Sequence, residues 1–125
     1  MKIANPLAVK GENLACNYLK RKGYRIIERN FRKGYGEIDI VALHPAGLGQ
    51  AQVLVFVEVK TRTSDLFGPP LEAITPWKIR TLVKTAQYYK LLHPQLPDSL
   101  RLDAIGVDFF SNPSPKIEHV KNITE

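Results

Sequence analysis

Two carboxylates and an ammonium stand in stretches that otherwise have the composition of buried strands. Residues 53–62 form a nearly unbroken apolar and β-branched run, typical of a strand covered on both faces, but this run contains Glu58 and Lys60. Residues 37–43 place Asp39 between two isoleucines. Charged side chains are rarely buried without a partner or a metal ion, so these positions are the first candidates for chemistry.

The spacing of these residues favours a single charged patch. Side chains alternate along a strand, so Glu58 and Lys60 share one face. If a loop over residues 45–52 joins the two strands as a hairpin, Asp39 and Glu58 lie about equally far from that loop and come side by side. Glu12 precedes apolar positions of an expected N-terminal helix by three, four and seven residues, so it points with the apolar face and could supply a third carboxylate.

A patch of this kind could act on phosphates. Clustered carboxylates repel each other unless something positive lies between them, and Mg²⁺ binds carboxylate oxygens while keeping several waters. A metal held there can bind a phosphate oxygen and lower the pKa of an attacking water, while Lys60 positions that water or stabilises the developing charge. The alternative is a structural salt bridge of Asp39 and Glu58 with Lys60 at a strand end, and the spacing alone leaves both open.

The elements that would position this patch follow in the order α-β-β-β-α-β-β. Asn5-Pro6 and Thr75-Pro76 each have an N-cap residue followed by proline, the pattern that starts a helix. A helix between the third and fourth strands favours an α/β fold with a mixed central sheet flanked by helices, in one domain spanning residues 1–125. The expected helices cover about 6–22 and 76–92, and the expected strands cover 24–31, 37–43, 53–62, 100–109 and 116–123.

The composition is that of a folded basic protein. Hydrophobic residues make up 44% of the 125 residues and charged residues 24%, close to globular averages. The net charge of +6 favours a polyanionic partner, although a merely basic surface gives the same count. No apolar run is long enough to span a membrane and no signal peptide is evident, so a cytoplasmic location is the simplest interpretation.

Other chemistries find little support in the sequence. The three histidines are scattered, each near the end of an expected element, and no spacing of His and Cys suggests a zinc site. No glycine-rich loop opens a helix as a phosphate-binding loop would, which argues against ATP use. Cys16 is the only cysteine, so no disulfide forms within the chain.

Taken together, several stretches resemble the YraN-like family of uncharacterised bacterial proteins. Gly36-Glu37-Ile38-Asp39, followed by Glu58-Val59-Lys60, is also similar to the two-part motif of the PD-(D/E)XK nuclease superfamily, with Ile38 in place of the proline. The resemblance covers about residues 9–108, and its other stretches are Gly11-Glu12, Leu14-Ala15, Arg29-Asn30-Phe31-Arg32, Phe56-Val57, Thr61-Arg62, Glu72-Ala73-Ile74-Thr75 and Arg101-Leu102-Asp103-Ala104-Ile105.

The resemblance implies a restriction-endonuclease-like fold, akin to archaeal Holliday-junction resolvases, and phosphodiester cleavage that depends on Mg²⁺ or Mn²⁺. Position by position, it makes Asp39 and Glu58 metal ligands and Lys60 the catalytic lysine. It matches Glu12 to the acidic residue of the first helix, which we include among the metal-binding candidates, and the backbone carbonyl of Val59 would complete the metal shell. We expect Glu12, Asp39, Glu58 and Lys60 to converge in one polar cavity.

The implied function is an endonuclease acting on branched or flapped DNA. Because a fold does not fix a function, the alternative is a non-catalytic nucleic-acid-binding module that keeps the nuclease fold. Four basic residues are the candidates for contacts with DNA phosphates, whose affinity falls as salt rises: Arg29, Arg32, Arg62 and Lys78. A homodimer would suit a two-fold junction substrate, but no feature of the sequence requires one.

Overall fold

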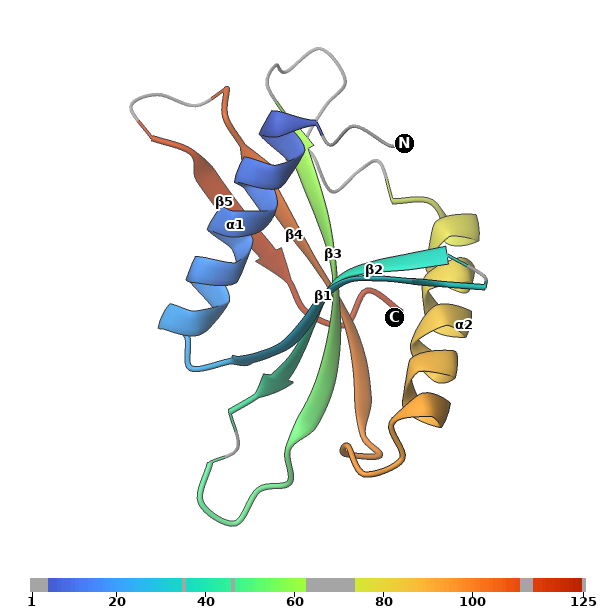
Figure 1. Ribbon diagram of the computed structural model, residues 1–125. Helices are drawn as coiled ribbons and strands as arrows, with labels where there is room; N and C mark the ends of the chain where they lie inside the picture. The colour runs from blue at the N-terminus through green and yellow to red at the C-terminus, as the bar shows by residue number, and fades with distance from the viewer. Residues whose placement is uncertain (1–4, 35, 46, 63–73, 111–113, 125) are drawn as a thin grey trace.

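The computed structural model describes residues 5–34, 36–45, 47–62, 74–110 and 114–124. A five-stranded mixed sheet, in the order β1-β2-β3-β4-β5, has one helix on each face (Figure 1). Only β3 and β4 pair in parallel, and α2 makes the crossover between them. The elements are α1 (Pro6–Arg21), β1 (Arg25–Lys33), β2 (Gly36–His44), β3 (Val53–Arg62), α2 (Pro76–Leu92), β4 (Leu100–Asp108) and β5 (Lys116–Val120).

This architecture confirms the predicted order and the mixed α/β fold class. Asn5 and Thr75 cap the two helices, as predicted, because their side chains accept hydrogen bonds from the Leu7 and Lys78 N–H groups. The bounds of β3 match the prediction, whereas β1 runs on to Lys33. The loop expected over 63–72 lies outside the described residues. No helix in the described part of the chain is long and apolar enough to span a bilayer.

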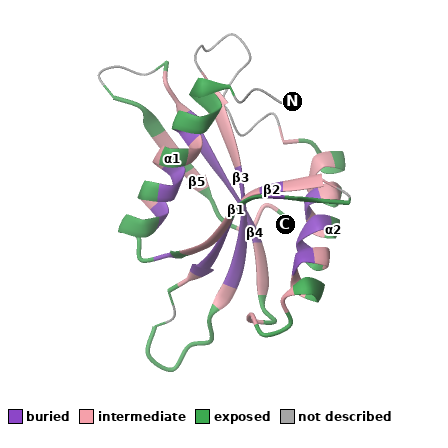
Figure 2. Cartoon of the chain, viewed as in Figure 1, coloured by how far each residue is buried: buried purple, intermediate pink, exposed green. Residues whose placement is uncertain are grey.

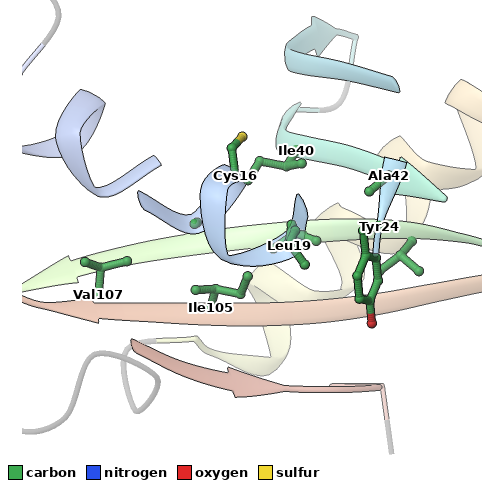
Figure 3. Packing of buried hydrophobic residues seen from close by; sticks show 10 residues of the cluster. Cys16, Leu19, Tyr24, Ile40, Ala42, Ile105 and Val107 are labelled. Carbon is green, nitrogen blue, oxygen red and sulfur yellow. The ribbon is translucent and has the colours of Figure 1, made fainter. Parts of the chain in front are cut away.

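The sheet is buried on both faces, which explains why β3 is so apolar. Figure 2 shows the buried class concentrated in the central strands and on the inner sides of the helices. On one face, α1 packs Ala15, Cys16 and Leu19 against residues of β2, β3 and β4 (Figure 3). On the other face, α2 packs Leu82, Ala86 and Tyr89 against a second cluster that includes Phe56 of β3. Cys16 is therefore a packing residue of the first cluster.

The contact of α1 with the sheet begins at Gly11. A Cβ at this position would collide with the Thr61 hydroxyl of β3, so glycine allows the helix and the strand to approach closely. The helix residues before Gly11 are exposed. Helical spacing places Ala8 on the same side of α1 as Ala15 and Leu19, but Ala8 is exposed because the first turn of the helix does not reach the sheet.

Strand β2 is kinked at Asp39, close to the point where it separates from β3. Ile38 belongs to the cluster on the α2 face and Ile40 to the cluster on the α1 face, although regular alternation would put both on one face. Opposite Asp39, Asn30 of β1 has a positive φ of 56°, a conformation that few non-glycine residues adopt. The β1–β2 hairpin therefore turns toward α2 beyond this point, as Figure 1 shows.

A buried ionic cluster fastens β5 and the C-terminal segment to β4. Asp103 is fully buried, and both its carboxylate oxygens accept hydrogen bonds from the Arg101 guanidinium at 2.8 Å. It also accepts from His119 Nε2 at 2.8 Å and from the Asn122 N–H at 3.0 Å. These donors lower the pKa of Asp103 to about 2, against the opposing effect of burial. His119, which the sequence presents as one scattered histidine, is thus a structural partner of Asp103.

We predict that Asp103→Asn lowers the free energy of unfolding by about 3–5 kcal/mol near neutral pH, because it leaves the Arg101 charge without its buried partner. The folded pKa of Asp103 lies below its ordinary 3.8, so its contribution is present above about pH 4 and lost as the pH falls toward 2. Urea unfolding at several pH values measures both effects. The control is Asp98→Asn, at a side chain that is 99% exposed. Equal stability of the two variants at neutral pH would contradict the structural role of Asp103.

Candidate functional site

The site lies where β2 separates from β3. The two strands pair only as far as Ile40 opposite Val57, while β3 continues beside β4 to Arg62. At the point of separation, the Val59 N–H donates a hydrogen bond of 2.7 Å to Asp39 Oδ2. The carboxylate thus takes the place of a main-chain acceptor that a continued β2 would provide.

Glu58 comes to the same place from β3. Its side chain is only 8% exposed, and it shares the α2 face of the sheet with the Phe56 side chain. Two ammonium groups approach its Oε1 atom: Lys60 Nζ from the same strand at 3.8 Å, and Lys78 Nζ from the first turn of α2 at 4.0 Å. Both distances exceed those of tight charge-assisted hydrogen bonds, so the pairs hold Glu58 loosely.

The surroundings of Asp39 and Glu58 disfavour the ionised form of both carboxylates. Burial, and then the negative charge of Glu58, raise the pKa of Asp39 to about 7, although the Val59 N–H lowers it. Burial also raises the pKa of Glu58, even though Lys78 and Lys60 act in the opposite direction. Two ionised carboxylates so close together in a partly buried place are stabilised by a cation between them.

Glu12 lies beside this pair but is held by β1. Its Oε1 atom accepts hydrogen bonds of 3.0 Å from Arg29 Nε and from Asn30 Nδ2. Its charge contributes to the raised pKa of Asp39, so the two carboxylates are near enough to interact. Within the described ranges, however, no three or more His, Cys, Asp or Glu side chains group closely enough to hold one metal ion. The structure thus brings Asp39, Glu58 and Lys60 together and ties Glu12 to the kink at Asn30.

The four predicted DNA-contacting cations are spread over several elements. Arg29 pairs with Glu12 at 3.0 Å, and Arg32 pairs with Glu37 at 2.8 Å near the tip of the β1–β2 hairpin. Arg62, at the end of β3, is partly buried. Lys78 points at Glu58 and so belongs to the acidic centre. A common DNA-facing surface for the four residues stays a prediction.

The contact of Lys78 with Glu58 is the part of the site that sequence reasoning missed. The available signal was indirect: the Thr75 cap fixes the start of α2, and the cap places Lys78 in the first turn. What the sequence did not indicate is that this end of α2 lies beside β3. The hairpin helps to set this arrangement, because Gly36 comes so near α2 that an added Cβ would lie 3.1 Å from Thr81 Cγ2.

We predict that Asp39→Asn stabilises the metal-free protein near pH 8 and has little effect near pH 4. Between the ordinary pKa of 3.8 and the folded value of about 7, the folded chain keeps a proton that the unfolded chain has lost, so stability falls as the pH rises through this window. The gain for the variant above pH 7 is at most about 4 kcal/mol. Urea unfolding in EDTA at both pH values measures it, with Asp98→Asn as the control. A difference between variant and wild type that does not change with pH would contradict the raised pKa.

Comparison with known proteins gives the family but no activity. The model of the uncharacterised protein family UPF0102 matches residues 11–107. A UPF0102 protein of Geobacter metallireducens is 46% identical over 119 residues, covering 95% of this chain and 92% of that protein. One from Mycobacterium sp. (strain KMS) is 42% identical over 113 residues, covering 90% and 81%.

Among solved structures, that of Pyrococcus furiosus SfsA in complex with Ca²⁺ has 14% sequence identity and a TM-score of 0.34, covering 92% of this chain and 62% of that one. The family match and the relatives confirm the expected membership of an uncharacterised bacterial family: the chain belongs to the protein family UPF0102.

Proposed function

We propose that this chain is a metal-dependent endonuclease that hydrolyses phosphodiester bonds in branched or flapped DNA. The observation that carries the proposal is the placement of Asp39 and Glu58 on two strands that diverge, with Lys60 and Lys78 beside them. A pair of carboxylates next to two ammonium groups is suited to hold a divalent cation and a phosphate together. The net charge of +6 supports a polyanionic substrate.

The donor set fits Mg²⁺ or Mn²⁺. Magnesium is usually bound by one or two carboxylates together with waters and substrate phosphates, so Asp39 and Glu58 suffice as protein side-chain ligands. The Val59 carbonyl is the proposed third ligand, next to the N–H group that orients Asp39. A bound metal would supply a Lewis acid for the phosphoryl group and an attacking water of lowered pKa.

The other residues act on the phosphate or on the shape of the site. Lys60 is the proposed catalytic lysine, because its ammonium group lies beside Glu58 and can stabilise negative charge that develops on the phosphate. Lys78 is placed to do the same from α2. Glu12, predicted as a ligand, is better placed to hold Asn30 and hence the kink opposite Asp39.

A non-catalytic nucleic-acid-binding module is the second candidate. It is favoured by the position of Glu12, the third predicted acidic ligand, whose carboxylate accepts hydrogen bonds from Arg29 and Asn30. Such a module would keep the basic residues but would not turn over DNA. Incubation with duplex, flap and four-way-junction DNA in Mg²⁺ or Mn²⁺ separates the two candidates, since only the endonuclease cuts.

We predict that Glu58→Gln abolishes cleavage and leaves folding and DNA binding intact. The amide keeps the size of the carboxylate but binds Mg²⁺ poorly, so the rate should fall at least about 100-fold. Loss of the loose contacts with Lys60 and Lys78 should cost less than about 1 kcal/mol, because both lysine side chains reach solvent. DNA binding should persist or tighten, since one negative charge is gone.

The control is Glu118→Gln, which makes the same chemical change at an exposed position of β5. Cleavage, thermal unfolding and DNA binding are measured on the same preparations of both variants. A Glu58→Gln protein that melts much earlier than wild type but still cuts DNA would overturn the catalytic assignment and support the purely structural salt bridge.

A further inference from the structure

The outer face of α2 carries an exposed tryptophan that the proposed chemistry does not use. Trp77 is the only tryptophan of the chain, and 67% of its surface is exposed. Tryptophan is highly buried on average, and an indole left largely in water at the start of a helix offers an aromatic face on which a partner can stack. The Thr81 hydroxyl donates to the Trp77 carbonyl at 3.1 Å, and thus the backbone that carries the indole is part of the regular helix.

Two basic residues lie on the same exposed face of α2 as Trp77. Arg80 and Lys84, three and seven residues further on, lie within about 60° of Trp77 around the helix and are exposed. The whole of α2 contains four basic residues and no acidic one. Lys90, the last of the four, instead turns toward the carbonyl groups of Pro94 and Leu96. Trp77, Arg80 and Lys84 therefore form a stripe, the α2 stripe, with an aromatic plane at one end and positive charge along it.

The α2 stripe starts at the candidate site. Lys78 follows Trp77 directly, and its Nζ atom lies 4.0 Å from Glu58 Oε1. Figure 1 shows this end of α2 beside the start of β2, whereas the other end of the helix lies far along the sheet. A strand that follows the stripe thus reaches the carboxylate pair at the Trp77 end.

We infer that the α2 stripe binds single-stranded DNA, with a base stacked on Trp77 and phosphates on Arg80 and Lys84, and leads the strand to Asp39 and Glu58; the second part rests on the proposed endonuclease function. An exposed aromatic ring together with a track of cations is the general solution for binding single strands. A base inside a duplex has both faces covered by its neighbours, so stacking selects unpaired nucleotides. The recognised part of the substrate is then the unpaired arm of a flap or branch.

A protein partner could also bind an exposed tryptophan, since tryptophan is enriched at binding hot spots. The charge of the α2 stripe favours the nucleic acid: Arg80 and Lys84 lie on a helix that contains no acidic residue, and two such cations complement a polyanion. A second copy of this chain is the least suitable occupant, because it would bring the same positive charge to the contact.

The single tryptophan makes the test direct. Short oligo(dT) is titrated against the wild-type protein in EDTA, so that binding is followed by Trp77 fluorescence without any cleavage. An oligomer of the same length with abasic sites throughout offers the phosphates but no base. We expect quenching by oligo(dT) and none by the abasic oligomer. Fluorescence anisotropy of labelled oligo(dT) should show affinity reduced about 5- to 150-fold in Trp77→Ala, with less than a two-fold change for the abasic oligomer.

The matched control is Leu91→Ala, which removes an apolar side chain that is 77% exposed at the far end of α2 and should leave affinity unchanged. Arg80→Gln should reduce the slope of log affinity against log salt by about 0.7. Equal quenching by both oligomers, or no effect of Trp77→Ala, would overturn base stacking. A fluorescence change with protein concentration alone would show self-association instead. Because these readouts need no metal, they stand or fall separately from cleavage.

Discussion

The hydrogen bond from the Val59 N–H to Asp39 Oδ2 is the constraint on which the site depends. Where β2 leaves β3, the N–H groups of β3 lose their main-chain partners, and a buried N–H without an acceptor costs free energy. The Asp39 carboxylate is the acceptor for the Val59 N–H, at 2.7 Å. The same bond fixes the carboxylate beside Glu58, so the separation of the strands and the placing of the acidic pair have one cause.

The surroundings of this bond are arranged to keep the strands apart. Asn30 takes a left-handed conformation opposite Asp39 and is held by Glu12 from α1. Beyond the kink, the hairpin packs on α2 at Gly36. The first turn of α2 then brings Lys78 toward Glu58. Both helices thus contribute to the site. Helix α1 supplies Glu12, which holds Asn30 at the kink, and helix α2 supplies the ammonium group of Lys78.

The sequence predicted the parts of this arrangement that depend on local patterns. The apolar run of β3 gave its bounds, the Asn5-Pro6 and Thr75-Pro76 pairs marked the helix starts, and equal distances from one loop brought Asp39 beside Glu58. These features follow from periodicity and capping, which a single stretch of sequence contains.

The parts that were missed depend on contacts between distant stretches. Regular alternation put Ile38 and Ile40 on one face, whereas the kink puts them on opposite faces. Lys78 was assigned to a DNA surface because nothing in its own stretch indicates that Glu58 lies opposite. His119 looked isolated because its partner, Asp103, is 16 residues away in the chain. Tertiary packing decides all three, and no local pattern encodes it.

The most direct measurement of the central claim is the anomalous scattering of Mn²⁺ in crystals of the protein, recorded with and without the ion. If Asp39 and Glu58 share a cation where β2 and β3 diverge, one anomalous peak should lie between their carboxylates, within reach of the Val59 carbonyl, and should vanish in Asp39→Asn crystals. Well-ordered crystals soaked in Mn²⁺ that show no peak there, or the same peak in the variant, would contradict the claim that the two carboxylates form a metal site.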